Sequence, residues 1–205
     1  RRMFTEISPY IFYKAEMAKG YYKLRDILDN KGLRHLFISG MPVFMYGGRA
    51  LMKDFDILVP DDEIETTASV LGLEVGVKDS SVAYTRFVDI APGVEIISNL
   101  SVKVGDDRIP FDYDFLEQQS KLVRFIGMGC RIMGLEDLIL FKAALGRFGP
   151  DDWGKHKDDL SDIEGLIGAQ RVDWNKLVNR ARKLNMETRL KDKITSLGHE
   201  VEIGF

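Results

Sequence analysis

Cysteine is nearly absent from this chain of 205 residues, which contains only Cys130. An internal disulfide therefore cannot form, and this is typical of proteins that work in a reducing environment. The sequence also lacks any run close to the ~20 consecutive apolar residues that a membrane-spanning helix requires. We accordingly expect a cytoplasmic protein with no membrane partner.

Several familiar catalytic motifs are missing as well. There is no G-x-x-x-x-G-K-[S/T] loop, which excludes a P-loop nucleotide site by motif. There is no G-x-S-x-G turn that would present a nucleophilic serine. The three histidines, His35, His156 and His199, do not have the spacing of a metal site.

What the chain does contain is an ordinary globular composition, with 45% hydrophobic and 30% charged residues. Its net charge of −3 hides an uneven distribution. Residues 54–79 carry eight acids and one base, Lys78, whereas residues 171–193 carry eight Lys/Arg and three Asp/Glu. Two solvated faces of opposite sign are the commoner explanation. The alternative is a metal-binding acidic site with a basic region that attracts a phosphate-bearing substrate.

Hydrophobic periodicity predicts an α/β fold. We expect an α/β core over residues 1–132 and a helical region over residues 133–205, packed on that core. Helices are expected at residues 10–30, 41–46, 63–71, 114–119, 135–147, 157–167, 174–184 and 187–197. Strands are expected at residues 33–38, 54–59, 73–77, 82–90 and 94–98, with a hairpin at residues 102–109.

Residues 38–59 carry the strongest chemical signal in the sequence. Asp54 and Asp56 lie two residues apart in a strand-like run, so their carboxylates point to the same face, ~7 Å apart along the backbone. Such a pair suits Mg²⁺, which takes one or two carboxylates and completes its shell with water and phosphate oxygens. Upstream, Ser39 and Gly40 precede a short helix, whose first backbone N–H groups favour phosphate.

The order of these pieces resembles the nucleotidyltransferase superfamily that includes polymerase beta, in particular its minimal and toxin-like branches. The matching motifs are S-G at residues 39–40, Y-G at 46–47 and D-F-D at 54–56, at the spacing of the family. The resemblance implies a mixed β-sheet flanked by helices. The sequence departs from the family pattern at three positions. Ser39 stands where glycine is usual, Arg49 comes one place early, and Met52 replaces a threonine.

The resemblance also implies site residues. Asp54 and Asp56 would bind Mg²⁺ or Mn²⁺, and Ser39 and Gly40 would line the triphosphate of the nucleotide. The family requires a third carboxylate on a neighbouring strand, and Glu95 is the preferred candidate because it follows a Pro-Gly turn. Asp89 is the alternative.

In the helical region, residues 140–147 and 156–163 also resemble family segments. By this resemblance Lys142 would approach the phosphates, and Asp159 or Asp162 would hold its helix against the core. A lysine on the polar side of an amphipathic helix is an equally good explanation of Lys142.

The function that follows is Mg²⁺-dependent transfer of a nucleoside monophosphate from a nucleoside triphosphate to the hydroxyl of an unknown acceptor, which is a small molecule, a protein or an RNA. The RNA alternative comes from a basic stripe at helical spacing, Lys176, Arg180 and Lys183, although such a stripe is more often a solvated face. The other alternative is a catalytically degenerate module of the toxin–antitoxin type, which binds nucleotide or another protein. The sequence leaves the nucleotide, the acceptor and the oligomeric state open.

Overall fold

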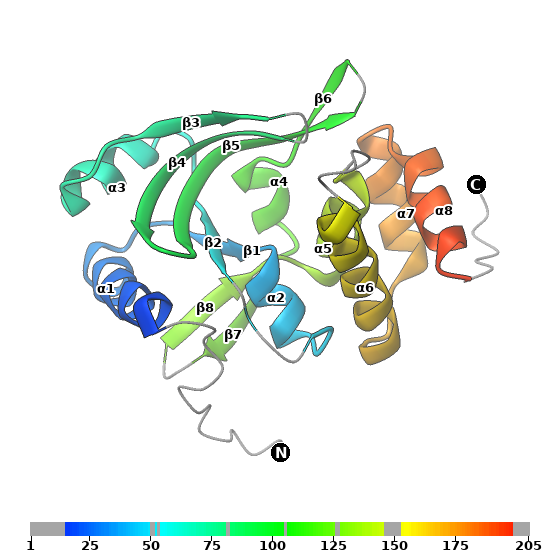
Figure 1. Cartoon of the computed structure of the whole chain (residues 1–205), viewed down its shortest axis with the longest axis horizontal. Helices are drawn as coiled ribbons and strands as arrows, with labels where there is room; N and C mark the ends of the chain where they lie inside the picture. Colours follow the sequence, from blue (N-terminus) through cyan, green and yellow to red (C-terminus); the bar gives the residue numbers. More distant parts are fainter. Residues whose placement is uncertain are drawn as a thin grey trace.

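A mixed β-sheet is the centre of the fold (Figure 1). A computed structural model of the chain describes residues 15–49, 52, 54–80, 83–104, 106–125, 128–145 and 153–198. Within this part the sheet has eight strands in the order β3-β4-β5-β2-β1-β8-β7, and β6 pairs with β5 beside that path. The strands are β1 (Leu36–Ile38), β2 (Phe55–Leu58), β3 (Gly76–Asp79), β4 (Ala83–Ala91), β5 (Val94–Val104), β6 (Asp107–Pro110), β7 (Lys121–Phe125) and β8 (Met128–Ile132).

Helices lie at both ends of the sheet. Figure 1 shows α1 and α3 at one end of the molecule and the group α5 to α8 at the other. None of the helices in the described residues is long and apolar enough to cross a membrane. The helices are α1 (Ala15–Lys31), α2 (Gly40–Met45), α3 (Ile64–Leu71), α4 (Tyr113–Glu117), α5 (Leu135–Ala144), α6 (Trp153–Ala169), α7 (Trp174–Lys183) and α8 (Glu187–Ser196).

The fold class expected from the sequence is confirmed, because the sheet is mixed, helices flank it and the last four helices follow it in the chain. The expected strand at residues 73–77 is wrong at its start, since β3 begins only at Gly76. The reason is that the Leu73 N–H donates to the Ala68 carbonyl and so still belongs to the end of α3. Residues 10–14, 82, 105, 146 and 147 of the expected elements lie outside the described residues.

The alternation of β2 and β5 explains which face of the sheet is the core. Phe55 and Ile57 of β2 are fully buried, as are Val94 and Ile96 of β5. Helix α1 covers this side, where the Tyr21 ring stacks on Phe55 with 5.1 Å between the ring centroids. Because successive side chains of a strand point to opposite faces, the residues between these apolar ones face the other way.

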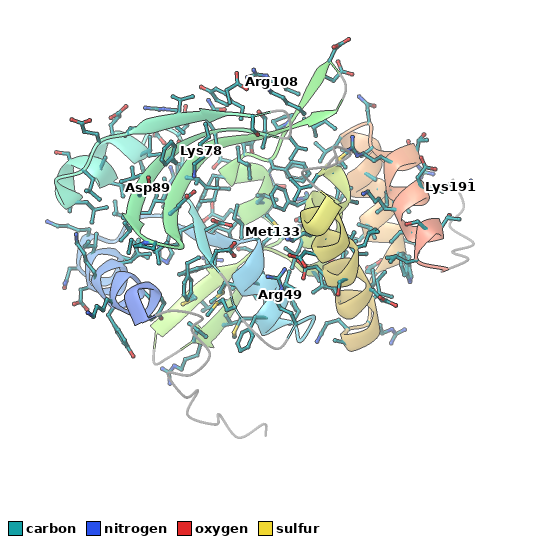
Figure 2. All side chains as sticks on the ribbon, viewed as in Figure 1. Arg49, Lys78, Asp89, Arg108, Met133 and Lys191 are labelled. Atoms are coloured by element: carbon teal, nitrogen blue, oxygen red, sulfur yellow. The ribbon has the colours of Figure 1, made fainter. Side chains whose placement is uncertain are left out.

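Helix α6 packs closely against the turn that leads towards β2. A Cβ atom at Gly165 would collide with the backbone carbonyl of Gly48, so only glycine permits this approach. Next to this contact Arg49 forms a bidentate ion pair with Asp162 of α6, and Figure 2 shows Arg49 between α2 and α6. Asp162 also binds Lys142 of α5, with its Oδ2 3.0 Å from Nζ. One carboxylate therefore joins α5, α6 and the loop before β2.

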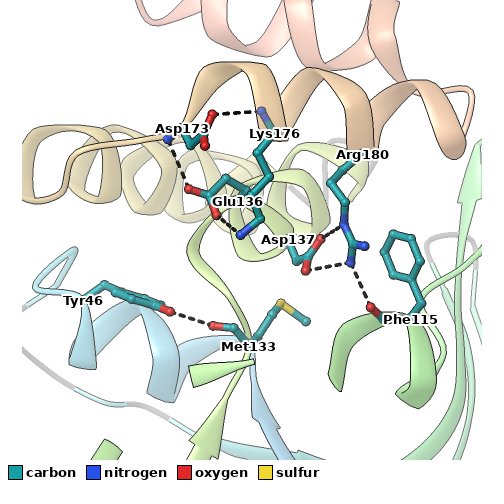
Figure 3. Close-up of polar contacts among 8 residues, drawn as sticks. All are labelled: Tyr46, Phe115, Met133, Glu136, Asp137, Asp173, Lys176 and Arg180. Carbon is teal, nitrogen blue, oxygen red and sulfur yellow. Dashed lines mark hydrogen bonds and ion pairs between the residues drawn. The ribbon is translucent and has the colours of Figure 1, made fainter. Parts of the chain in front are cut away.

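Helix α7 is attached to α5 by a second set of ion pairs (Figure 3). Arg180 donates two hydrogen bonds to Asp137, at 2.6 and 2.8 Å, and Lys176 lies 2.8 Å from a carboxylate oxygen of Glu136. The expectation of a solvated stripe is therefore wrong for Arg180, which is buried, whereas Lys183 is exposed. The charges of Lys176 and Arg180 bind helix to helix, and this weakens the RNA alternative.

The shared position of Asp162 gives a test of this packing. Asp162→Asn removes the charge that Arg49 and Lys142 share, and leaves two cations with less compensation in a buried place. We expect the free energy of unfolding to fall by about 3 kcal/mol in urea denaturation. Glu187→Gln, which breaks the exposed pair with Arg182, is the matched control and should cost less than ~1 kcal/mol. Equal losses in the two variants would contradict the joining role of Asp162.

Candidate active site

Strand register brings the predicted acids onto one face of the sheet. Asp56 of β2 lies opposite Glu95 of the parallel strand β5, and Glu95 lies opposite Asp89 of the antiparallel strand β4. Residues directly opposite in neighbouring strands share a face, so these three form a row across the sheet. Asp54 precedes β2 by one residue and lies two positions before Asp56. The four acids therefore line the face opposite the apolar core.

Of the two candidates for the third acid, Glu95 is one strand from Asp56 and Asp89 is two strands away. Glu95 is half-buried, whereas Asp89 is exposed. The charge of Glu95 contributes to the raised pKa of Asp56. This geometry favours Glu95, whose role as a metal ligand stays a prediction.

Gly40 brings the turn between β1 and α2 against Asp54. Gly40 is buried, and a Cβ atom there would collide with Oδ1 of Asp54. That same oxygen is buried and has no hydrogen-bond partner among the described residues. A buried carboxylate oxygen without a partner is costly, and a bound cation would satisfy it. The Ser39–Gly40 turn, which is predicted to bind phosphate, and Asp54 are thus immediate neighbours.

Ser39 occupies a backbone conformation that favours glycine, with φ 60° and ψ −122°. Such a conformation costs a non-glycine residue of order 1–3 kcal/mol and is found mainly at functional sites. The side chain compensates in part, because its hydroxyl hydrogen-bonds to Asp56. The serine that departs from the family pattern therefore contacts the second acid directly, which the sequence did not reveal.

Asp56 has the most perturbed acidity in the site. The pKa of Asp56 is raised from 3.8 to about 7, chiefly by burial and then by the charges of Asp54 and Glu95, while the hydrogen bond from Ser39 and the charge of Lys142 act to lower it. A carboxylate that is held in its charged form only at a cost is poised to bind a cation.

Lys142 is buried, and its ammonium lies between two carboxylates of α6. Its Nζ is 3.1 Å from Oδ1 of Asp159 and 3.0 Å from Oδ2 of Asp162. The expectation that one of these aspartates holds the helix against the core thus applies to both. Lys142 is close enough to Asp56 to affect its pKa, and its contact with phosphate stays a prediction.

Within the described residues, no group of three or more His, Cys, Asp or Glu side chains is arranged to hold a metal ion. Glu95 instead directs Oε1 to Lys78, 2.5 Å from its Nζ. Even so, Asp54, Asp56 and Glu95 suit a hard divalent cation, because all three are carboxylates. Oδ1 of Asp54 is buried without a hydrogen-bond partner among the described residues, and the negative charges of the three groups repel one another, so a cation would relieve both. Lys78 is the one base in the acid-rich segment of residues 54–79, and no motif in the sequence pointed to it.

The remaining acids of residues 54–79 are mostly used elsewhere. Arg86 binds Asp61 and Glu65, and Lys103 binds Asp79 with 2.5 Å between Nζ and Oδ1. Ion pairing from outside the segment thus compensates much of its charge. Outside the candidate site most of these acids are exposed, as a solvated face predicts, and only Asp54 and Asp56 belong to the site.

Comparison with known proteins is informative only at the level of structure. No protein-family model and no curated protein matches the sequence. A solved structure of a candidate nucleotidyltransferase from Thermotoga maritima matches 76% of this chain and 95% of its own, with 15% identity and a TM-score of 0.52. The chain has a nucleotidyltransferase-like fold.

Two further solved structures are more distant. A lincosamide antibiotic adenylyltransferase bound to lincomycin has 12% identity and a TM-score of 0.45, over 74% of this chain and 97% of that one. A nucleotidyltransferase-like protein from Paracoccidioides brasiliensis has 15% identity and a TM-score of 0.42, over 86% of this chain and 92% of that one. At these scores the assignment of a nucleotidyltransferase-like fold rests on the Thermotoga maritima structure.

The raised pKa of Asp56 gives a pH test. The folded protein holds the proton of Asp56 more tightly than the unfolded chain, so the wild type loses stability as pH rises from about 4 to about 7. Asp56→Asn removes this loss, and its melting temperature should exceed that of the wild type at pH 8 but not at pH 4. The full shift corresponds to about 4 kcal/mol, and screening should reduce the gain to about 2 kcal/mol. Parallel melting curves across this range would contradict the assignment.

The contact between Gly40 and Asp54 gives a second test. Gly40→Ala pushes a methyl group onto the Asp54 carboxylate, so we expect a loss of about 1–3 kcal/mol in unfolding free energy. Binding of Mn²⁺, followed by calorimetry, should weaken in the same variant. Gly168→Ala is the matched control, since a Cβ atom there meets nothing within 4 Å, and it should be neutral or stabilising. Unchanged Mn²⁺ affinity in Gly40→Ala would show that the turn and Asp54 are independent.

Proposed function

We propose that the protein transfers a nucleoside monophosphate from a nucleoside triphosphate to an acceptor hydroxyl, and that it depends on Mg²⁺ or Mn²⁺. The observation that carries the proposal is the placement of Asp54, Asp56 and Glu95 on one face of two adjacent strands, with the Ser39–Gly40 turn in contact with Asp54 and Asp56. The nucleotidyltransferase-like fold supports it.

In this proposal Asp54 and Asp56 hold the divalent cation, and Glu95 completes its ligands. The bound cation would neutralise phosphate charge and make the pyrophosphate a better leaving group. Ser39 and Gly40 bind the triphosphate through backbone N–H groups that precede the interior of α2. Lys142 contributes positive charge behind Asp56.

The acceptor approaches on the side of Glu95, which is half-buried, and of Asp89, which is exposed. Its hydroxyl oxygen attacks the α-phosphorus, the bond from that phosphorus to pyrophosphate breaks, and Glu95 helps to remove the hydroxyl proton. The protein contributes no covalent nucleophile, so its contribution is positioning and the neutralisation of charge.

The degenerate, nucleotide-binding or protein-interaction module is the second candidate. Two observations favour it: the strained serine at the start of the phosphate turn and the ion pair that occupies Glu95. Both leave Asp54 and Asp56 in place, so a nucleotide can still bind where turnover is lost. The two candidate functions therefore differ in whether the protein catalyses the transfer of a nucleoside monophosphate.

Nucleotide binding and turnover together test the proposal. We expect calorimetry with ATP, CTP, GTP and UTP in the presence of Mg²⁺ to detect binding of at least one of them, and pyrophosphate release to follow with a pool of small-molecule, protein or RNA acceptors. Asp56→Asn should reduce turnover about 100-fold or more, because it removes a ligand of the cation that neutralises charge at the reacting phosphate.

Asp62→Asn is the matched control, since Asp62 is exposed and lies 3.8 Å from Arg34 outside the site. It should retain wild-type turnover. Full activity of Asp56→Asn would refute the assignment of the site. Nucleotide binding without pyrophosphate release from any acceptor would favour the degenerate module.

A further inference from the structure

Lys78 reaches across the sheet to the third acid of the proposed site. It lies on β3, the strand at the sheet edge, opposite Thr85 of β4. Its Nζ is 2.5 Å from Oε1 of Glu95, which lies on β5 beyond β4. The ammonium also lies 4.4 Å from the centroid of the Phe87 ring, and Figure 2 labels Lys78 and, on the neighbouring strand β4, Asp89. The function proposed above gives this lysine no task.

The ion pair makes Glu95 a carboxylate with two competing partners. Glu95 contributes to the raised pKa of Asp56, so its charge is close to the aspartate pair. Yet the described residues contain no group of three ligands arranged around a common metal position. An ammonium on Glu95 compensates its charge in the absence of metal, but the same ammonium repels a divalent cation that approaches the same carboxylate.

We propose that Lys78 holds Glu95 away from Asp54 and Asp56, so that Lys78 and the divalent cation compete for this carboxylate. The inference rests on the proposed function, because it takes the two aspartates as metal ligands. Lys78 is then a positioning residue, which decides when the third acid joins the site.

The surroundings of Lys78 allow the exchange that this role requires. Its side chain is 45% exposed, so the ammonium can leave Glu95 for water at small cost. When the Lys78 ammonium is displaced from Glu95, the Phe87 ring remains as a second partner for it on the same face. A partly exposed pair of this kind changes an equilibrium constant by about 1.5- to 5-fold. Competition on this scale tunes metal affinity without abolishing it.

Mn²⁺ binding by the full chain, measured by calorimetry at pH 7.5, tests the role of Lys78. We expect Lys78→Met to bind Mn²⁺ about two- to fivefold more tightly than the wild type, because Glu95 loses its internal partner. Lys78→Arg keeps a cation and should bind as the wild type does. The double variant Lys78→Met/Glu95→Gln should bind no more tightly than Glu95→Gln, since the gain acts through Glu95.

Lys103→Met controls for net charge, because Lys103 binds Asp79 and not Glu95. Equal tightening in Lys103→Met and Lys78→Met would overturn the proposal, as would unchanged or weaker binding in Lys78→Met. Mn²⁺ binding that Asp56→Asn abolishes but Lys78→Met does not alter would refute the role of Lys78 and leave the metal site of the proposed function standing. A wild-type chain that binds no Mn²⁺ would overturn both.

Discussion

The parallel pairing of β2 with β5 is the constraint on which the site depends. It places Asp56 directly beside Glu95, while Asp54 follows from the two-residue period of the strand. Three carboxylates are thereby forced together on one face, because the alternate residues Phe55, Ile57, Val94 and Ile96 must be buried on the other. Burial of the apolar face fixes the register, and the register fixes the charge cluster.

Much of the surrounding structure compensates for this cluster. Ser39 has a strained backbone conformation and its side chain hydrogen-bonds to Asp56. The charge of Lys142, on α5, acts on the same carboxylate. Lys78 pairs with Glu95 from the sheet edge. These three groups come from separate parts of the chain, so the site depends on how the sheet edge and the helical region pack against β2.

The helical region is more than a cover for the sheet. Asp162 of α6 binds both Arg49, in the loop before β2, and Lys142 of α5. The same carboxylate therefore fixes the loop that leads to the aspartate pair and the lysine that acts on Asp56. The close approach of Gly165 to Gly48 makes this contact sterically feasible. The division of the chain at residue 132 remains a prediction, and these contacts show that the helices after it pack on the loop before β2.

Local patterns in the sequence were sufficient for most of the element order, though not for β7 and β8, and for the α/β fold class and the shared face of Asp54 and Asp56. Period-two alternation and turn residues act over a few residues, and therefore a single sequence reveals them. The start of β3 was misjudged because the hydrogen bonds that end α3 extend into residues that look strand-like.

Only the tertiary structure decided which distant groups meet the acids. Strand register places Glu95, which the sequence already favoured, nearer to Asp56 than Asp89 is. The buried ion pairs of Arg180 and Lys142 follow from helix packing, and the pairing of Lys78 with Glu95 requires a side chain to reach past a neighbouring strand. Side chains at such sequence separations come together through the whole fold, and no local pattern encodes them. The sequence determined the aspartate pair, and the tertiary structure decided its partners.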